Sequence, residues 1–384
     1  MNIESRLTKN AFAASCFGMM FFGITMVALG CVLPTLSEQL ALTTGHKATL
    51  AFTLTSSILV GSIIFGPVCD RYGHRALFLS SCFSVLLGIT GIASATSLHL
   101  LIVSYVLIGV GGGVLNGQTN TIVSDLYSSE KLRGARLSLL GAFYGVGAMS
   151  ITLLVWLFGN HIDITYVLLA IAILLAMGTA FCFKVQFPAP KQPQSFPLRD
   201  AFRLLRNPML VMLSLVLLFQ SSIESVTNNL ATTYFSHIEH AVLLLTVMMA
   251  ALIMARFALI WIAKRMTQNH ILYSFLSITV CGFLIMPFAQ TLPVAMLAMV
   301  LVGFGISATY PVVLGHLGAK FNKLSGTAFG IAISIALAGS SVINAFVGGL
   351  LLNYYPYVMI TAVLIMVILF RLGINRRKHT TKKN

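Results

Sequence analysis

The stretch that decides the fold is Gly66-Pro67-Val68-Cys69-Asp70-Arg71-Tyr72-Gly73-His74-Arg75. It is a short polar turn between two apolar runs, 48–67 and 76–95. Each run is long enough to cross about 30 Å of hydrocarbon as a helix rising about 1.5 Å per residue. Gly66 and Gly73 permit the backbone angles of a tight turn, and Asp70 can accept hydrogen bonds from unpaired N–H groups at a helix start. The stretch predicts two membrane helices joined by a tight charged turn.

The composition extends this prediction to the whole chain. Of its 384 residues, 58% are hydrophobic and only 9% are charged, whereas a soluble domain carries about 25% charged residues. A soluble enzyme, a disordered chain and a secreted disulfide scaffold are therefore excluded. A transmembrane barrel would show alternating strands of ~10 residues, but this chain has long unbroken apolar runs. The six cysteines lie far apart and are expected to be small buried apolar side chains.

Twelve apolar segments are long enough to span a membrane. The first is too long for a signal peptide and lacks a small-residue cleavage site, so we interpret it as a retained helix. The segments are approximately 11–34, 48–67, 76–95, 99–123, 136–157, 163–184, 208–234, 241–263, 270–290, 293–318, 325–351 and 355–371. The prediction is an all-α membrane protein with 12 transmembrane helices.

The basic residues predict the orientation of these helices. All but two of the 24 Lys and Arg residues lie on one side of the predicted membrane. The exceptions are Lys47, on the other side, and Arg256, inside a span. The positive-inside rule makes the basic side cytoplasmic, together with both termini. The net charge of +15 thus reflects topology, and we expect no nucleic-acid partner.

The chain divides into two related halves. The longest polar stretch, 185–207, contains four prolines and reads as a cytoplasmic linker, with a short amphipathic helix predicted around 198–205. It separates a six-helix bundle at 1–184 from a second one at 208–384, which ends in a short basic tail. Residues 106–111 resemble residues 300–305 at an offset of 194 residues, and the same offset places 70–71 on 264–265. Such repeats are typical of a known transporter architecture.

The turn at 66–75 resembles the signature loop of the major facilitator superfamily, Gly-x-x-x-Asp-Arg/Lys-x-Gly-Arg/Lys-Arg/Lys. Gly66, Asp70, Arg71, Gly73 and Arg75 match this motif, and His74 departs from it. The resemblance implies the major facilitator fold and alternating access, in which two bundles rock about a central cavity. It assigns the five matching residues to a conformational gate.

A narrower resemblance is to the fucose/glucose-type sugar permeases. It rests on glycine-rich and polar patterns at 109–120, 137–148, 224–235 and 303–311. The chain departs from that group at Gly30 and Asn116, where some proton-coupled members carry acids, and at Leu230, where a tryptophan is usual. Drug antiporters carry Gly-Pro in the fifth helix, and Met149-Ser150 stands there instead.

Two charged residues, Glu224 and Arg256, lie well inside predicted spans. Each would cost on the order of 2.5–3.5 kcal/mol if it faced lipid, so each is expected to face a partner or a wet cavity. Both are candidate coupling residues, with Glu224 as the proton site if coupling exists and a structural ion pair as the alternative. Their predicted depths differ by ~7 Å, which leaves a direct pair open.

Other polar side chains inside the spans are candidates for substrate binding. Gln220, Glu224 and Asn228 recur every four residues and share one helix face. Amides and a carboxylate together offer donors and acceptors for hydroxyl or amide groups, and Tyr310 with Pro311 predicts a helix break beside a cavity. The full candidate set is Asn116, Asn120, Tyr144, Gln220, Glu224, Asn228, Tyr310 and Asn344.

These features predict a secondary transporter of the cytoplasmic (inner) membrane. No phosphate loop of the Gly-x4-Gly-Lys-Ser/Thr kind is present, so the chain is a uniporter or a gradient-driven carrier. We expect uptake of a small polar solute, such as a sugar or sugar derivative, with a proton or sodium ion as the candidate coupling ion. We expect a monomer in the lipid bilayer, no cofactor, no metal site and no enzymatic activity. An exporter of drugs or metabolites is the main alternative, and a membrane receptor is a weaker one.

Overall fold

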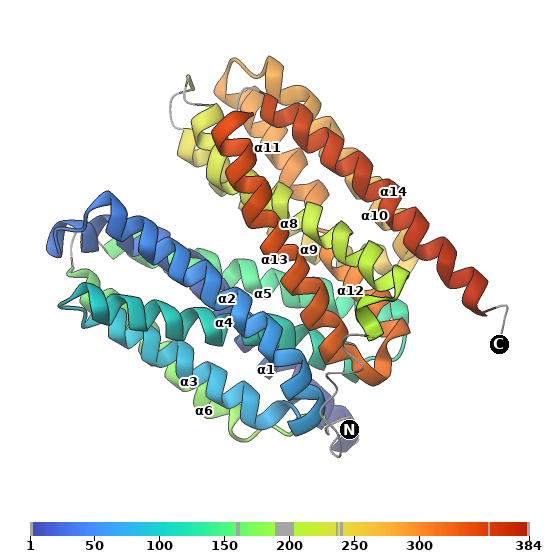
Figure 1. The fold of residues 1–384 in the computed structure, drawn as a ribbon, viewed down its shortest axis with the longest axis horizontal. Helices are drawn as coiled ribbons and strands as arrows, with labels where there is room; N and C mark the ends of the chain where they lie inside the picture. The colour runs from blue at the N-terminus through green and yellow to red at the C-terminus, as the bar shows by residue number, and fades with distance from the viewer. Residues whose placement is uncertain are drawn as a thin grey trace. The chain divides into compact units, whose positions relative to one another are not determined.

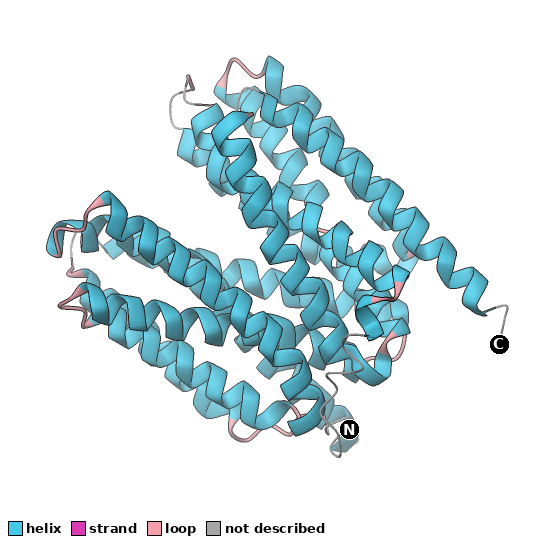
Figure 2. Ribbon diagram, viewed as in Figure 1, coloured by secondary structure: helices cyan, strands magenta, loops and turns pink. Residues whose placement is uncertain are grey.

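The computed structural model describes residues 3–158, 162–188, 203–235, 237–238, 241–351 and 354–381. Helices make up nearly all of these ranges, and no β-strand occurs within them (Figure 2). The first part of the chain contains α1 (Ile3–Gln39), α2 (Thr44–Tyr72), α3 (His74–Ala93), α4 (Leu98–Leu126), α5 (Glu130–Phe158) and α6 (Ile164–Cys182). The second contains α8 (Pro208–Tyr234), α9 (Ala241–Arg265), α10 (Gln268–Ile285), η1 (Met286–Phe288), α11 (Leu292–Ile306), α12 (Thr309–Lys320), η2 (Asn322–Leu324), α13 (Ser325–Leu350) and α14 (Tyr355–Thr381).

Eleven membrane spans are long and apolar enough within the described residues. The twelfth predicted span, 136–157, lies in α5, which is helical but is not one of the eleven. The side chains of residues 152 and 155–157 of this helix lie outside the described part of the chain. The all-helical membrane architecture is confirmed, whereas the count of twelve spans stays a prediction. Most of the linker helix predicted around 198–205 falls outside the described residues.

The helix break predicted at Tyr310 and Pro311 is present slightly earlier. α11 ends at Ile306 and α12 begins at Thr309. Pro311 therefore lies in the first turn of α12, where its missing N–H removes no helical hydrogen bond. One span thus consists of two helices, and the backbone between them needs partners from elsewhere.

Cys281 corrects the expectation for the cysteines. Cys16, Cys69, Cys82 and Cys182 are buried, but Cys281 is exposed on α10. A thiol is apolar enough to face lipid, so a membrane helix does not need to bury it inside the protein.

The chain forms two compact units. The first comprises Met1–Leu126, Phe143–Leu198 and Lys323–Gly330, and the second comprises Tyr127–Ala142, Arg199–Asn322 and Ile331–Asn384. The start of α5 therefore belongs to the second unit, and the start of α13 belongs to the first. The division of the chain at 185–207 stays a prediction.

The same packing order recurs in both units. In the first unit α4 packs against α2 and α3, and α6 packs against α1 and α3. In the second unit α11 packs against α9 and α10, and α14 packs against α8 and α10 (Figure 1). Because each helix of one set has a counterpart in the other, the packing supports the internal repeat inferred from the sequence.

Glycines at equivalent positions bring these helices together. A Cβ atom on Gly111 of α4 would lie 2.7 Å from the carbonyl oxygen of Ser81 in α3. A Cβ atom on Gly305 of α11 would lie 2.7 Å from the carbonyl oxygen of Phe275 in α10. Gly305 lies 194 residues after Gly111, and Phe275 lies 194 residues after Ser81. The repeated Gly-x-Gly thus lets backbones approach as small residues do in membrane helices.

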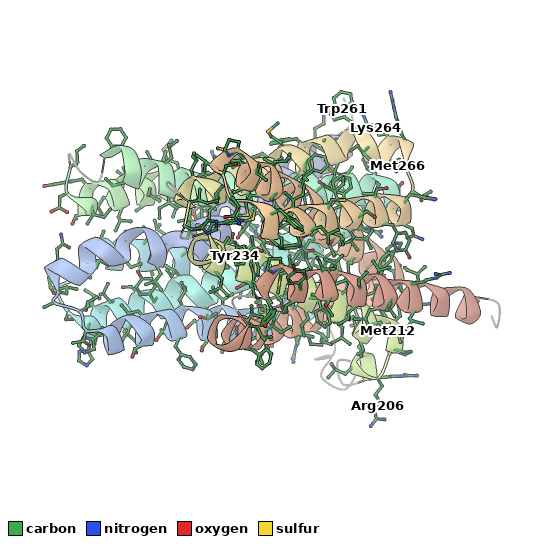
Figure 3. The ribbon with its side chains drawn as sticks, turned by 90° about the horizontal axis from the view of Figure 1, so that it is seen from above. Arg206, Met212, Tyr234, Trp261, Lys264 and Met266 are labelled. Carbon is green, nitrogen blue, oxygen red and sulfur yellow. The ribbon has the colours of Figure 1, made fainter. Side chains whose placement is uncertain are left out.

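The end of α9 carries a side-chain pair typical of a membrane interface. Trp261 is 72% exposed, and the Lys264 Nζ lies 5.1 Å from the centroid of its indole ring. Figure 3 labels both at this end of α9, with Met266 just beyond them. Tryptophan concentrates at the membrane–water boundary, and lysine extends its charge toward water. We expect this end of α9 to mark the edge of the hydrocarbon.

Replacing either glycine by alanine should destabilise the protein. Gly111→Ala and Gly305→Ala would each force a carbonyl oxygen away from the new methyl group, and such overpacking typically costs about 1–3 kcal/mol. Both variants should therefore melt at lower temperature than the wild type in detergent. Gly178→Ala is the matched control, because its Cβ would meet aromatic side chains rather than backbone, the Phe17 ring at 3.2 Å and the Phe21 ring at 3.6 Å. Melting of Gly111→Ala and Gly305→Ala at the control's temperature would contradict this role.

Candidate functional site

The turn between α2 and α3 holds the start of α13. Asp70 is buried at the end of α2, with 2% of its surface exposed. Its Oδ2 accepts a hydrogen bond from the Thr327 backbone N–H, at 2.9 Å, and another from the Thr327 hydroxyl, at 2.6 Å. Thr327 lies in the first turn of α13, where N–H groups have no helical partner and negative charge is favoured. The predicted contact of Asp70 with a helix start is confirmed, and the helix is α13.

Both glycines of the turn have a structural reason. A Cβ atom on Gly66 would lie 2.8 Å from the Gly326 carbonyl oxygen and 2.9 Å from the Thr327 Cα, so α2 and α13 can meet only at a glycine. Gly73 has φ 82°, in the region that favours glycine, and its N–H donates to the Cys69 carbonyl at the end of α2. Gly66 thus permits contact with α13, and Gly73 permits the turn into α3.

The two arginines of the motif extend away from this contact. The Arg71 guanidinium lies 5.0 Å from the centroid of the Tyr72 ring. Arg75 donates through Nη2 to the Phe183 carbonyl, at 3.1 Å, and so attaches the turn to the chain just after α6. Arg75 therefore anchors the turn within the first unit.

A second carboxylate, absent from the predicted set, also reaches α13. The Asp125 Oδ1 accepts a hydrogen bond from the Ser325 hydroxyl at 2.9 Å. Its Oδ2 lies 3.6 Å from the His74 Nε2. The sequence does carry a signal for Asp125, because acidic residues are scarce here and this one lies in the last turn of a helix, where the dipole disfavours negative charge. An acidic residue in that position needs a compensating partner.

Three of the predicted substrate residues lie in the first unit. Asn116 and Asn120 are buried on α4, where the Asn120 Nδ2 donates to the Asn116 carbonyl at 2.7 Å. Tyr144, on α5, is half-buried, and its ring centroid lies 5.6 Å from that of Phe22 on α1. The two amides are therefore consecutive on one helix face, as their spacing predicts.

Other predicted residues gather in the second unit around the break between α11 and α12. The Gln220 Nε2 on α8 donates to the Ile306 carbonyl at 3.0 Å, which supplies a partner at the last residue of α11. Ser221, the next residue, shares a 2.6 Å hydrogen bond with the Tyr310 hydroxyl of α12. The buried Gln220 Oε1 has no hydrogen-bond partner among the described residues. The polar face of α8 thus contacts the break between α11 and α12. The Gln220 Oε1 remains there as a hydrogen-bond acceptor.

Glu224 and Arg256 lie in the same region of the second unit. The charge of Arg256 interacts with that of Glu224, and both interact with Tyr310. Arg256 is 5% exposed, whereas Glu224 is half-buried. The sequence left contact between the two open; the structure places their charges close enough to act on each other.

Arg256 also binds the start of α5. Its Nη1 donates to the Gly141 carbonyl, and the Ser138 hydroxyl donates to the Arg256 carbonyl at 2.8 Å. A Cβ atom on Gly141 would lie 2.9 Å from the Arg256 Nη1, so the glycine provides the space for the guanidinium. Arg256 therefore connects α9 to the part of α5 that belongs to the second unit.

Two predicted residues add less to this arrangement. Asn228 is half-buried on α8, one turn beyond Glu224. Asn344 lies in α13, but its side chain is outside the described part of the chain. The candidate substrate residues are thus divided between the two units.

Loss of the Asp70 carboxylate should destabilise the protein. Asp70→Ala would leave the N–H and hydroxyl of Thr327 without their acceptor, and a buried unsatisfied donor costs about 1–3 kcal/mol. We expect a clear fall in melting temperature. Thr327→Val, which removes only the hydroxyl, should give a smaller fall, and Thr327→Ser should match the wild type. The interpretation fails if Asp70→Ala and Thr327→Ser have the same melting temperature.

Comparisons with known proteins agree with this architecture. The family model of the Major Facilitator Superfamily matches residues 14–343. The outward-facing structure of the transporter FucP aligns with a TM-score of 0.80 at 17% identity, covering 94% of this chain and 98% of that one. The proton:xylose symporter XylE aligns with a TM-score of 0.77 at 13% identity, covering 97% of this chain and 94% of that one.

Curated relatives match over shorter segments. The arabinose-proton symporter of Escherichia coli K12 is 24% identical over 151 residues, which are 36% of this chain and 32% of the relative. Multidrug resistance protein 3 of Bacillus subtilis is 31% identical over 93 residues, which are 24% of this chain and 18% of the relative. The chain thus spans less than a third of each of these relatives. With the family model covering most of its length, the chain belongs to the Major Facilitator Superfamily and is a multi-pass membrane protein.

Proposed function

We propose that this chain is a secondary active transporter that moves a small polar solute by alternating access. The observation that carries the proposal is the cluster of Glu224, Arg256 and Tyr310 in the second unit. An ionisable pair inside apolar helices is costly and typically marks a substrate or ion pathway. In this cluster Glu224 is the coupling carboxylate, and Arg256 is the residue that responds to its charge.

The arrangement around Arg256 supports a link between binding and movement. Its guanidinium binds the Gly141 carbonyl of α5 while it interacts with the Glu224 carboxylate. A proton or a substrate group on Glu224 would change the attraction on the guanidinium, and therefore its hold on α5. The contact of Asp70 with α13 supplies a second element whose release would accompany a change of access.

We further propose a polar substrate of the sugar or sugar-derivative class. Gln220, Ser221, Glu224 and Tyr310 provide amide, hydroxyl and carboxylate groups around a helix break, a set suited to binding hydroxyl groups. The relatives named for arabinose and xylose favour this class. The relative named for multidrug resistance keeps export of drugs or metabolites as the second candidate.

The remaining expectations extend this proposal. We propose residence in the cytoplasmic membrane with both termini in the cytoplasm, supported by the one-sided distribution of Lys and Arg. We also propose twelve spans in two bundles, 1–184 and 208–384, joined by the linker 185–207. The packing order shared by the two units supports the two related bundles.

A ligand screen should separate the two candidate functions. A ligand that binds only the folded protein raises its melting temperature by mass action, by an amount equivalent to about 2.7 kcal/mol at one hundred times its Kd. We expect sugars or polyols to raise the melting temperature of purified protein, and lipophilic cations to leave it unchanged. Stabilisation by lipophilic cations alone would favour the exporter.

Neutralising Glu224 should separate accumulation from exchange. The assay measures uptake, into proteoliposomes, of the ligand that the screen identifies. Glu224→Gln should abolish the accumulation of this ligand that a proton gradient drives. Exchange of labelled for unlabelled ligand should continue, because the fixed neutral amide mimics the protonated state and still permits reorientation.

Ser222→Ala is the matched control for this experiment. Ser222 is buried on the same helix, and its hydroxyl donates to the Leu218 carbonyl one turn away. This variant should accumulate substrate like the wild type. Continued accumulation against a gradient by Glu224→Gln would overturn the assignment of Glu224 as the coupling site.

A further inference from the structure

The second half of the chain carries a positive charge that no acidic residue balances. After Glu239 the sequence contains eleven Lys and Arg residues and no Asp or Glu. One of the eleven is Arg256, inside α9, and the other ten lie on the side of the membrane predicted to be cytoplasmic. The positive-inside rule accounts for an excess of basic residues on that side, but it does not require acidic residues to be missing there. The net charge of this end is therefore strongly positive.

The turn between α9 and α10 presents two of these cations. Lys264 and Arg265 are the last residues of α9, and both are exposed. By the 194-residue offset they correspond to Asp70 and Arg71 of the first unit. A lysine thus stands where the first unit has a carboxylate, and the turn of the second unit has two cations and no acidic residue in its sequence.

Contacts among three other helices build the surface beside this turn. The His316 Nε2 of α12 lies 3.1 Å from the Asn269 Oδ1 in the first turn of α10. The Phe370 ring of α14 packs on both helices, with its centroid 5.6 Å from that of His316 and 5.9 Å from that of Tyr273 on α10. These contacts hold the start of α10, the end of α12 and α14 together.

Two more cations lie on this surface. Lys320 is the last residue of α12, four residues after His316, and therefore lies on the same face of that helix one turn further on. Arg371 directly follows Phe370 on α14, and both cations are exposed. Within the described part of the chain, none of these cations or those of the turn takes part in an ion pair. We call the cluster the basic end; its members are Lys264, Arg265, Lys320 and Arg371.

α14 extends the positive charge beyond the membrane. Its apolar segment long enough to span a membrane ends at Ile374, but the helix continues to Thr381. Figure 1 shows its last turns projecting away from the other helices of its unit. Residues 376–383 contain five Lys and Arg residues. A cluster of about four to eight basic residues immediately beyond a membrane helix is typical of binding to anionic lipids.

The position of Trp261 identifies the kind of partner. This exposed indole lies at the end of α9 with the Lys264 Nζ 5.1 Å from its ring centroid (Figure 3). Tryptophan and lysine take these positions at the membrane–water boundary, where lipid headgroups lie. Clustered cations repel one another, so an anionic headgroup stabilises them and a zwitterionic one does so less.

We propose that the basic end binds the headgroups of anionic phospholipids. Lys264 and Arg265 bind the phosphate of a lipid beside Trp261, and Lys320 and Arg371 continue the same positive surface across α12 and α14. This interaction goes beyond the proposed transport function, because it uses a surface apart from Glu224 and requires neither a substrate nor a coupling ion.

Quenching of Trp261 by brominated lipids provides the test. The chain has two tryptophans, so Trp156→Phe leaves Trp261 as the only one. Full-length protein with this substitution would be reconstituted in phosphatidylcholine vesicles containing a minor fraction of brominated phosphatidylglycerol or, in parallel, of brominated phosphatidylcholine. Bromine quenches only nearby indoles, so the ratio of the two quenching constants reports the relative affinity of the two lipids at this surface.

We expect phosphatidylglycerol to bind about fivefold more tightly or better, the effect of a single cation at a charged membrane surface. The preference should fall as the salt concentration rises, because these charges are exposed to solvent. Equal quenching by the two lipids would overturn the proposal.

Variants assign the preference to the basic end. Lys264→Gln combined with Arg265→Gln should bring the two quenching constants close to equality, and Lys320→Gln combined with Arg371→Gln should lower their ratio. Lys264→Arg combined with Arg265→Lys keeps both charges and should keep the preference, which separates loss of charge from altered folding. Lys184→Gln is the matched control, since it removes an exposed cation of the first unit, and it should also keep the preference. An unchanged ratio in either pair of glutamine substitutions would contradict the proposal.

Inorganic phosphate distinguishes a lipid headgroup from a soluble anion. At matched ionic strength, replacing chloride by phosphate should leave the lipid preference unchanged. Loss of the preference in phosphate alone would assign the basic end to a soluble phosphate compound and rule out the lipid. None of these measurements involves the transported ligand, so this proposal and the role of Glu224 can fail separately.

Discussion

The structure depends on the absence of water from the bilayer core. In hydrocarbon every backbone polar group and every charge must find its partner within the protein, which is why long helices span it. Where a helix is interrupted, another side chain takes over, as Gln220 does at the Ile306 carbonyl. Where a cation lies inside, a backbone carbonyl binds it and a carboxylate interacts with its charge, as Gly141 and Glu224 do for Arg256. The requirement that makes the chain helical therefore also places interacting polar side chains at helix breaks and at buried charges.

Close packing provides the second level of organisation. Lipid chains are as apolar as leucine, so helices in a membrane associate through close contact rather than through the hydrophobic effect. The repeated Gly-x-Gly brings α4 to α3 and α11 to α10 at matching positions. The same glycine pattern, present once in each unit, therefore accounts for the matching contacts of α4 and α11.

The charged turn at 66–75 holds a helix end through hydrogen bonds within the first unit. Two carboxylates, Asp70 and Asp125, receive donors from the first turn of α13. Hydrogen bonds to a helix start can be exchanged for hydrogen bonds to water at modest net cost, unlike an apolar interface. A contact of this kind is strong enough to hold a helix end and weak enough to release it.

The sequence by itself determined the helical membrane class, the positions of most spans, the repeat and the tight turn. Each follows from local properties: hydropathy over about twenty residues, the spacing of glycines, and the few charges within apolar runs. It also identified Asp70, Glu224 and Arg256 as residues that need partners. It could not determine that Thr327 is the partner of Asp70, 257 residues away, or that Asp125 and His74 belong to the same contact. Only the tertiary structure decided these pairs, because hydropathy and periodicity describe a residue's own helix, whereas a hydrogen bond is made by whichever helix packs beside it.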